Sequence, residues 1–355
     1  MDRTTEKILR IIAYPLGWTY ALAVFVRNKL FDWGLLDSAT AECPTISVGN
    51  LTAGGTGKTP HTEYLLELLS SSGIAAAEVS RGHKRKSRGF MEYGESCTAE
   101  DIGDESFQIA RKFPDVKIAV DHERVHAIRL LKEKYPGLSA VVLDDCMQHR
   151  YIKPGISILL CDYARPYYKD CILPYGNLRE CKNESRRADI IIVSKCPQDM
   201  TPAERTTIIN EVRPLPHQRL FFTTMEYGAA YPLFGEGHAK KMEKADKILL
   251  LTAIANPRPL QEHLETMFDE VVAMSFSDHH FFTADDWLNI SETFGNSSGS
   301  MILVTEKDAS KIQDDISVPA NLKPHIFVLP IRVVFLDDGD EFDKIILDYV
   351  NSQKP

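Results

Sequence analysis

Residues 52–59 combine glycines with a lysine and a threonine in a pattern that could bind phosphate, reading Thr-Ala-Gly-Gly-Thr-Gly-Lys-Thr. Glycines let a backbone wrap an anion with its N–H groups pointing inward, and a helix beginning at Lys58 would present its positive dipole end. Lys58 is expected to reach the β- and γ-phosphates, and the Thr59 hydroxyl to ligate Mg²⁺. The alternative is a structural, glycine-rich turn before a helix that binds no phosphate. The Walker A pattern fits except at its first glycine, and the predicted nucleotide-binding residues are Thr52, Ala53, Gly54, Gly55, Thr56, Gly57, Lys58 and Thr59.

A pair of carboxylates provides a second candidate for metal chemistry. Asp144 and Asp145 directly follow the apolar run 141–143, which resembles a Walker B segment. We predict Asp145 as the Mg²⁺ ligand, with Asp144 as a residue of the metal's outer sphere or of the substrate site; a solvated acidic turn is the alternative. Guanine specificity normally needs an N-K-x-D segment, and the runs at 194–197 and 305–308 both fail this pattern. ATP is therefore the favoured nucleotide.

These residues need a scaffold, and the surrounding pattern predicts an α/β fold. Short β-rich runs alternate with helical stretches such as 58–72 and 123–135, which is typical of a parallel sheet covered on both faces. A second series of strands and helices follows the Pro-rich stretch 213–216. The expected strands are 45–48, 75–80, 116–120, 140–143, 156–161 and 190–193, then 221–224 as a link, 247–253, 270–274, 301–305 and a last strand 326–335 that carries Pro330.

Composition excludes several protein classes. With 355 residues, the chain exceeds one small domain at roughly 100–200 residues per domain. Its formal net charge of −9 disfavours a dedicated nucleic-acid binder, so no nucleic-acid partner is predicted. The seven cysteines contain no C-x-x-C pair, which disfavours a structural zinc site and suits a reducing compartment. Nothing in the sequence predicts an obligate protein partner.

The N-terminus carries an uncharged run from Ile11 to Val26, flanked by Arg10 and Arg27. As a helix this run would span about 24 Å, which is short of a ~30 Å hydrocarbon core. Its aromatic residues beside basic ones favour a helix lying in the membrane interface. A buried helix and a secretory signal are the alternatives. The latter is disfavoured because it would export the phosphate loop away from ATP.

Several segments together resemble the tetraacyldisaccharide 4'-kinases of lipid A synthesis. The run 48–60 resembles their phosphate loop, in which the first Walker glycine is also missing. Further likenesses are Ser80-Arg81-Gly82, Gly103-Asp104-Glu105, the D-D-x-x-Q-H run 144–149, the L-P-x-G-x-x-R-E run 173–180, Asp278-His279 and the T-E-K-D run 305–308. His83 replaces a tyrosine of the family and Cys146 a glycine.

The resemblance implies an ATP-dependent kinase that phosphorylates the 4'-hydroxyl of tetraacyldisaccharide 1-phosphate, a lipid disaccharide, to give lipid IV-A. It also implies two α/β/α sandwich domains joined by a two-stranded linker, with the active site in the cleft between them. The expected division is a membrane-associated helix at 1–35, a P-loop domain at 36–220, a smaller α/β domain at 221–335 and a C-terminal helix at 336–355 packing on the first domain. The N-terminal helix would attach the protein, as a peripheral or monotopic one, to the cytoplasmic face of the bacterial inner membrane.

The resemblance further assigns roles to single residues. It points to Asp104 as the base that accepts the hydroxyl proton, paired with His279 across the cleft, and to Lys58 as a catalytic cation. Without the resemblance, Asp104 would be a helix cap and His279 a surface histidine. Residues proposed to bind the lipid disaccharide are Arg81, Asp144, His149, Asn177, Arg179 and Glu180, although structural roles are open for several of them.

Two other functions remain open at this level. One is a P-loop phosphotransferase with a soluble substrate, which would have no need of an interfacial helix. The other is a membrane-associated switch ATPase, which would hydrolyse ATP without an acceptor lipid.

Overall fold

The computed structural model describes residues 3–235, 247–296 and 301–353. Its larger sheet has nine strands in the order β14-β8-β7-β6-β1-β5-β2-β4-β3, and all neighbours from β8 to β4 pair in parallel. The strands are β1 (Thr45–Asn50), β2 (Ala76–Ser80), β3 (Met91–Glu92), β4 (Lys117–Val120), β5 (Ala140–Asp144), β6 (Ile156–Asp162), β7 (Ile190–Ser194), β8 (Arg219–Tyr227) and β14 (Ile331–Phe335).

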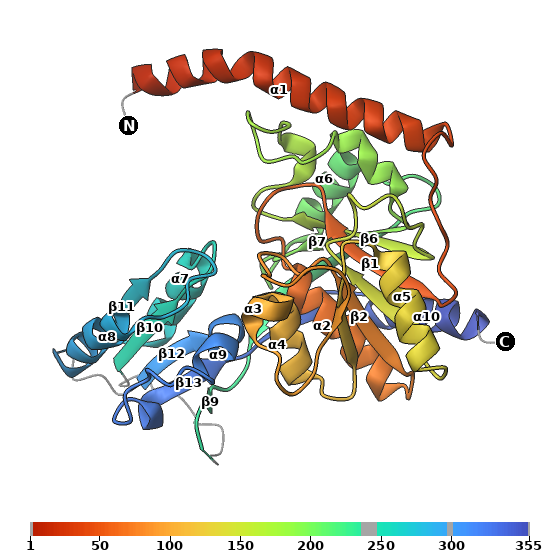
Figure 1. Cartoon of the computed structure of the whole chain (residues 1–355). Coiled ribbons are helices and arrows are strands. Elements are labelled where there is room, and N and C mark those ends of the chain that lie inside the picture. The colour runs from red at the N-terminus through yellow and green to blue at the C-terminus, as the bar shows by residue number, and fades with distance from the viewer. Residues whose placement is uncertain (1–2, 236–246, 297–300, 354–355) are drawn as a thin grey trace.

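Helices cover both faces of this sheet (Figure 1). One face packs against α2 (Lys58–Ser71), α4 (Asp104–Lys112) and α10 (Gly339–Ser352), whose Leu66, Phe107 and Ile346 join the core of the sheet. The other face packs against α5 (Arg124–Lys134) and α6 (Pro202–Val212). Burial on both faces explains why the central strands are continuous apolar runs rather than alternating ones. The short α3 (Ala99–Ile102) precedes α4.

The smaller sheet has five strands in the order β11-β10-β12-β13-β9. They are β9 (Tyr231–Pro232), β10 (Lys247–Thr252), β11 (Glu270–Ser275), β12 (Met301–Thr305) and β13 (Ile326–Leu329), and the helices are α7 (Arg258–Met267), α8 (Ala284–Asn296) and α9 (Glu306–Ile312). Side chains of α8 and α9 share one core with the sheet, while those of α7 lie in another. A capping box opens α8, because Thr283 and Asp286 exchange hydrogen bonds.

The connection between the sheets corrects one expectation. The predicted single strand 326–335 is two strands, because Pro330 interrupts it: β13 belongs to the smaller sheet and β14 to the larger one. β14 pairs antiparallel with β8, and both strands lie at one edge of the larger sheet. Proline lacks the N–H that a continuous ladder needs, so the chain changes sheets at this residue.

Helix α1 (Arg3–Asp32) runs across one end of the larger unit (Figure 1). Its described side chains begin after residue 16, so those of Arg10 and Tyr14 lie outside the described ones. Trp18, Leu22 and Phe25 are 68%, 61% and 53% exposed, so the described part of the uncharged run, residues 17–26, does not form a buried helix. Among the described residues, no helix combines the length and the apolar character needed to cross a bilayer.

Candidate active site

The phosphate loop joins the carboxyl end of β1 to the start of α2. Its backbone needs glycine twice, since Gly54 has φ 116° and Gly57 has φ 86°. The Asn50 side chain donates to the Thr56 hydroxyl at 2.8 Å, and the Ser194 hydroxyl donates to the Thr56 carbonyl at 2.8 Å. These contacts fix the conformation of the loop. The Ala53 and Thr56 N–H groups are used within the protein, and the amino end of α2 is where N–H groups can face an anion.

The acidic pair lies beside this loop, at the carboxyl end of the neighbouring strand β5. Asp145 accepts hydrogen bonds from Arg179 Nη1 at 2.9 and 3.0 Å and lies 3.8 Å from Lys58 Nζ. Burial would raise the pKa of Asp145, but the charges of Lys58 and Arg179 outweigh it and lower this pKa. Burial and the charge of Glu105 raise the pKa of Asp144 to about 7. Asp145 lies beside the loop that carries Thr59, and a carboxylate and a hydroxyl are the kinds of oxygen donor that Mg²⁺ takes together with phosphate oxygens.

Asp104 and His279 meet across the two units. His279 Nδ1 lies 2.6 Å from Asp104 Oδ2, and both side chains are largely buried, at 11% and 4% exposure. Gly103, not Asp104, caps α4, so the helix-cap alternative for Asp104 is wrong, and the burial of His279 argues against a surface histidine. His279 has φ 67°, an uncommon value for a residue other than glycine, and this turn points its ring at Asp104.

The electrostatics of Asp104 follow from these contacts. Burial would raise its pKa, but the hydrogen bond with His279 and the charge of Lys307 together lower it to about 2. Its other oxygen, Oδ1, is buried and has no hydrogen-bond partner among the described residues. Asp104 is therefore an ionised carboxylate with one oxygen fixed and one available to accept a proton.

The structure places the predicted substrate residues in different surroundings. Arg179 donates hydrogen bonds to the side chains of Asp145 and Gln148, so it lies at the acidic pair. Asn177 lies beside the phosphate loop, where its carbonyl accepts from the Ala53 N–H at 2.6 Å. Arg81 is exposed at the end of β2, the edge of the sheet at which β1 and β5 also end.

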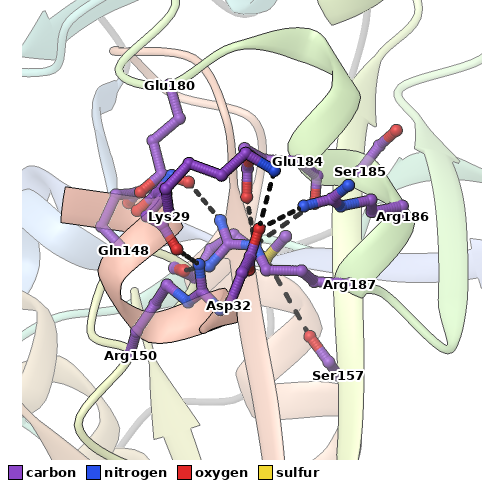
Figure 2. A network of polar contacts seen from close by, with 12 residues as sticks. Lys29, Asp32, Gln148, Arg150, Ser157, Glu180, Glu184, Ser185, Arg186 and Arg187 are labelled. Carbon is purple, nitrogen blue, oxygen red and sulfur yellow. Dashed lines mark hydrogen bonds and ion pairs between the residues drawn. The ribbon is translucent and has the colours of Figure 1, made fainter. Parts of the chain in front are cut away.

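Glu180 and His149 are less accessible. Glu180 is 1% exposed and forms an ion pair with Arg187 beneath α1, which favours a structural role (Figure 2). His149 packs against Tyr151, with ring centroids 5.7 Å apart, and burial lowers its pKa to about 4. Cys146 does not have a positive φ in the structure, so its side chain is tolerated where the family has glycine. His83 lies beside His279, with ring centroids 5.4 Å apart.

Helix α1 contacts the residues that hold the acidic pair. The Tyr20 hydroxyl donates to the Arg179 carbonyl at 2.9 Å, and Arg27 donates to the Gln148 carbonyl. Figure 2 shows Asp32, the last residue of α1, between Arg150 and Arg186, which it meets at 2.9 and 2.7 Å. A Cβ at Gly17 would lie 2.5 Å from the Tyr175 ring, so only glycine allows this approach to the 173–176 loop.

Sequence reasoning missed three residues at this site. Lys195 donates to the Gly55 carbonyl and to Asp162, which fastens the phosphate loop to β6 and β7. His61 joins the Gly57 carbonyl to Thr223 of β8. Lys307 lies 3.5 Å from Asp104. Lys307 belongs to the T-E-K-D run that the sequence singled out, so a signal existed, but only the fold brings it to Asp104.

Known proteins resemble this chain over nearly its whole length. Residues 9–351 match the family model described as tetraacyldisaccharide-1-P 4'-kinase. This chain belongs to that family. It is 46% identical to the tetraacyldisaccharide 4'-kinase of Phocaeicola vulgatus over 95% of this chain and 94% of the relative. It is 44% identical to that of Bacteroides thetaiotaomicron over 99% and 95%.

A solved structure of the family also matches. LpxK from Aquifex aeolicus, crystallised in complex with ATP, superposes with a TM-score of 0.76 at 28% identity and covers 96% of this chain and 99% of its own. The family likeness stated from sequence motifs is thereby confirmed, as is the mixed α/β fold with parallel sheets.

Proposed function

We infer that this protein transfers the γ-phosphoryl group of ATP to the 4'-hydroxyl of tetraacyldisaccharide 1-phosphate, giving lipid IV-A. Family membership over nearly the whole chain supports the substrate pair. The observation that carries the chemistry is the Asp104–His279 contact at 2.6 Å, which joins a buried carboxylate of the P-loop unit to the second unit.

The residues divide the work of phosphoryl transfer. The loop N–H groups and Lys58 hold the β- and γ-phosphates, and bound Mg²⁺ would neutralise phosphate charge from Thr59 and Asp145. The substrate hydroxyl donates its proton to Asp104 Oδ1 as its oxygen forms a bond to the γ-phosphorus. The bond from that phosphorus to the bridging oxygen breaks, and its electron pair leaves with ADP. His279 fixes Oδ2 and so turns Oδ1 toward the hydroxyl.

The distribution of charge suits an anionic lipid. Arg81, Lys84 and Arg88 are exposed in the loop after β2, whereas Arg85 is held by the Val120 and Gly89 carbonyls. We propose that the exposed cations bind the 1-phosphate of the substrate. The apolar face of α1 would lie in the interface of the inner membrane on its cytoplasmic side, where the lipid is presented to the site.

A labelling assay tests the proposal. The purified protein is mixed with γ-labelled ATP, Mg²⁺ and tetraacyldisaccharide 1-phosphate in detergent micelles, and the lipids are separated by thin-layer chromatography. We expect label on the lipid, lost in Lys58→Ala and retained in Lys153→Ala, which removes an exposed lysine outside the site. Labelling of a soluble acceptor in place of the lipid would indicate the soluble-substrate alternative.

A further inference from the structure

Lys307 stands at the junction of the two units and has no part in the roles assigned above. It is the second residue of α9, and its side chain is 18% exposed. Its Nζ donates to Asp278 Oδ1 at 3.0 Å and lies 3.5 Å from Asp104 Oδ2. One lysine of the second unit therefore bridges the candidate base to the aspartate that precedes His279.

Two side chains of the second unit, His279 and Lys307, approach the same oxygen of Asp104. His279 Nδ1 and Lys307 Nζ are each near Oδ2, and Oδ1 has no hydrogen-bond partner within the described parts of the chain. A carboxylate held at one oxygen only keeps a defined rotamer, and its lone pairs on the other oxygen point in a fixed direction. Lys307 therefore lies at the oxygen whose contacts set the orientation of the Asp104 carboxylate.

The charges around Asp104 make Lys307 the main permanent cation near it. His279 and Asp278 approach from the loop after β11, and Lys307 and Lys311 from α9. His83 and Glu105 act from the first unit. Lys311 is tied to the His280 carbonyl and to Asp308. A buried carboxylate without a close cation takes up protons more readily, because burial disfavours its charge.

We propose that Lys307 is a positioning residue for phosphoryl transfer, which keeps Asp104 ionised and turned so that Oδ1 receives the hydroxyl proton. This inference rests on the proposed function. Lys307 touches neither reacting atom in this role; it acts through Asp104.

A double-mutant cycle tests whether Lys307 acts through Asp104. In the wild-type background, Lys307→Met should lower kcat about tenfold with little change in KM for ATP. In the Asp104→Ala background, the same change should cost less than about twofold, because the group it positions is gone. Lys307→Arg should restore kcat to within about threefold, since a guanidinium reaches both carboxylates. Equal losses in both backgrounds would overturn the proposal.

The pH profile separates positioning from mere contact between the units. Without Lys307 the pKa of Asp104 should rise, so kcat of Lys307→Met should fall more than that of the wild type between pH 7 and pH 4.5, at equal folded fraction by circular dichroism. Lys112→Met is the control, because Lys112 bridges Glu63 to Glu306 across the units without touching Asp104. A raised KM for ATP with an unmoved acid limb would show that Lys307 contacts nucleotide instead. If the wild type transfers no label to lipid, the proposed function itself fails, which is a different result from an unmoved profile in an active enzyme.

Discussion

The two carboxylate oxygens of Asp104 differ in their surroundings, and this difference defines the residue's candidate role. Oδ2 is held by His279 and faced by Lys307, while Oδ1 is buried without a partner among the described residues. A buried acceptor left unpaired normally costs about 1–3 kcal/mol, so the protein keeps it at the expense of stability. Such a group is expected where a substrate supplies the missing partner.

Removing this carboxylate should therefore affect catalysis far more than binding. Asp104→Ala should lower kcat at least ~10²-fold with little change in KM for ATP, the loss usual for a missing general base. Steady-state kinetics with the lipid substrate measure both constants. Glu100→Ala, which removes an exposed carboxylate nearby, should stay close to the wild type. Near-normal turnover of Asp104→Ala would remove the residue from the chemistry.

Sequence motifs singled out Lys58, Asp145, Asp104 and His279, because short patterns fix residue types at a strand end or a helix start. The structure brings Lys58 to Asp145 and His279 to Asp104. Glu180, also proposed to bind the substrate, is buried in an ion pair with Arg187, which favours a structural role, whereas its neighbour Arg179 lies at the acidic pair. Adjacent residues of an extended segment point to opposite sides, and the burial of one of them depends on α1 packing over it. The contact of α1 with this segment joins residues as far apart as Tyr20 and Arg179, 159 positions along the chain, so it leaves no local signal.

Among the elements, α2 carries the end of the phosphate loop and is tied to strand β8 by His61. Burial lowers the pKa of His61 to about 4. The unfolded chain, with an ordinary pKa of about 6.5, binds more protons than the folded one between these values, so stability falls as pH drops through this window.

Substituting His61 should make the stability of the fold less dependent on pH. From pH 7 to pH 5, the wild type should lose roughly 2 kcal/mol more of its unfolding free energy than His61→Gln, which retains a hydrogen-bonding side chain. Urea unfolding at the two pH values measures the difference. Parallel losses in both proteins would mean that His61 is protonated in the folded state or exposed to solvent.

Helix α1 packs on the 173–176 loop through Gly17. Gly17→Leu should lift α1 from the 173–176 loop, because even a Cβ would lie 2.8 Å from Pro174. Since Tyr20 and Arg27 hold the segments that carry Arg179 and Gln148, lipid phosphorylation should fall severalfold, while nucleotide affinity measured by calorimetry changes less. Ala23→Leu, an exposed site on the same helix, is the matched control. Equal activity of the two variants would show that the packing of α1 on the 173–176 loop does not affect the function of the acidic pair.

At the scale of the whole molecule, the exposed apolar side chains of α1 lie on a helix whose other contacts reach the acidic pair. Trp18 and Phe25 of α1, and Trp33 directly after it, are each more than half exposed, at 68%, 53% and 69%. Replacing all three with serine should shift the protein from the membrane to the soluble fraction on vesicle sedimentation, because aromatic burial in the interface is lost. Deleting residues 1–31 should do the same. The control is Leu288→Ser, which changes an exposed apolar residue of α8 and should sediment as the wild type does. Unchanged sedimentation of the triple variant would count against an interfacial helix.

Periodicity predicted most of the larger sheet, because strands buried on both faces are continuous apolar runs. It could not predict that β14 returns to the larger sheet after Pro330, since pairing with β8 is decided by segments about a hundred residues apart. Nor could it predict that Lys307 meets Asp104, which depends on how the two units pack.

If ATP is consumed for transfer to a lipid hydroxyl, ADP release and phosphorylation of the lipid must be coupled. ADP released and phosphate incorporated into tetraacyldisaccharide 1-phosphate are counted in the same reaction, with and without the lipid. We expect one phosphate on the lipid for each ADP and almost no ADP release without lipid. Rapid ATP hydrolysis in the absence of lipid, with no phosphorylated lipid in its presence, would exclude lipid phosphorylation and indicate a switch ATPase.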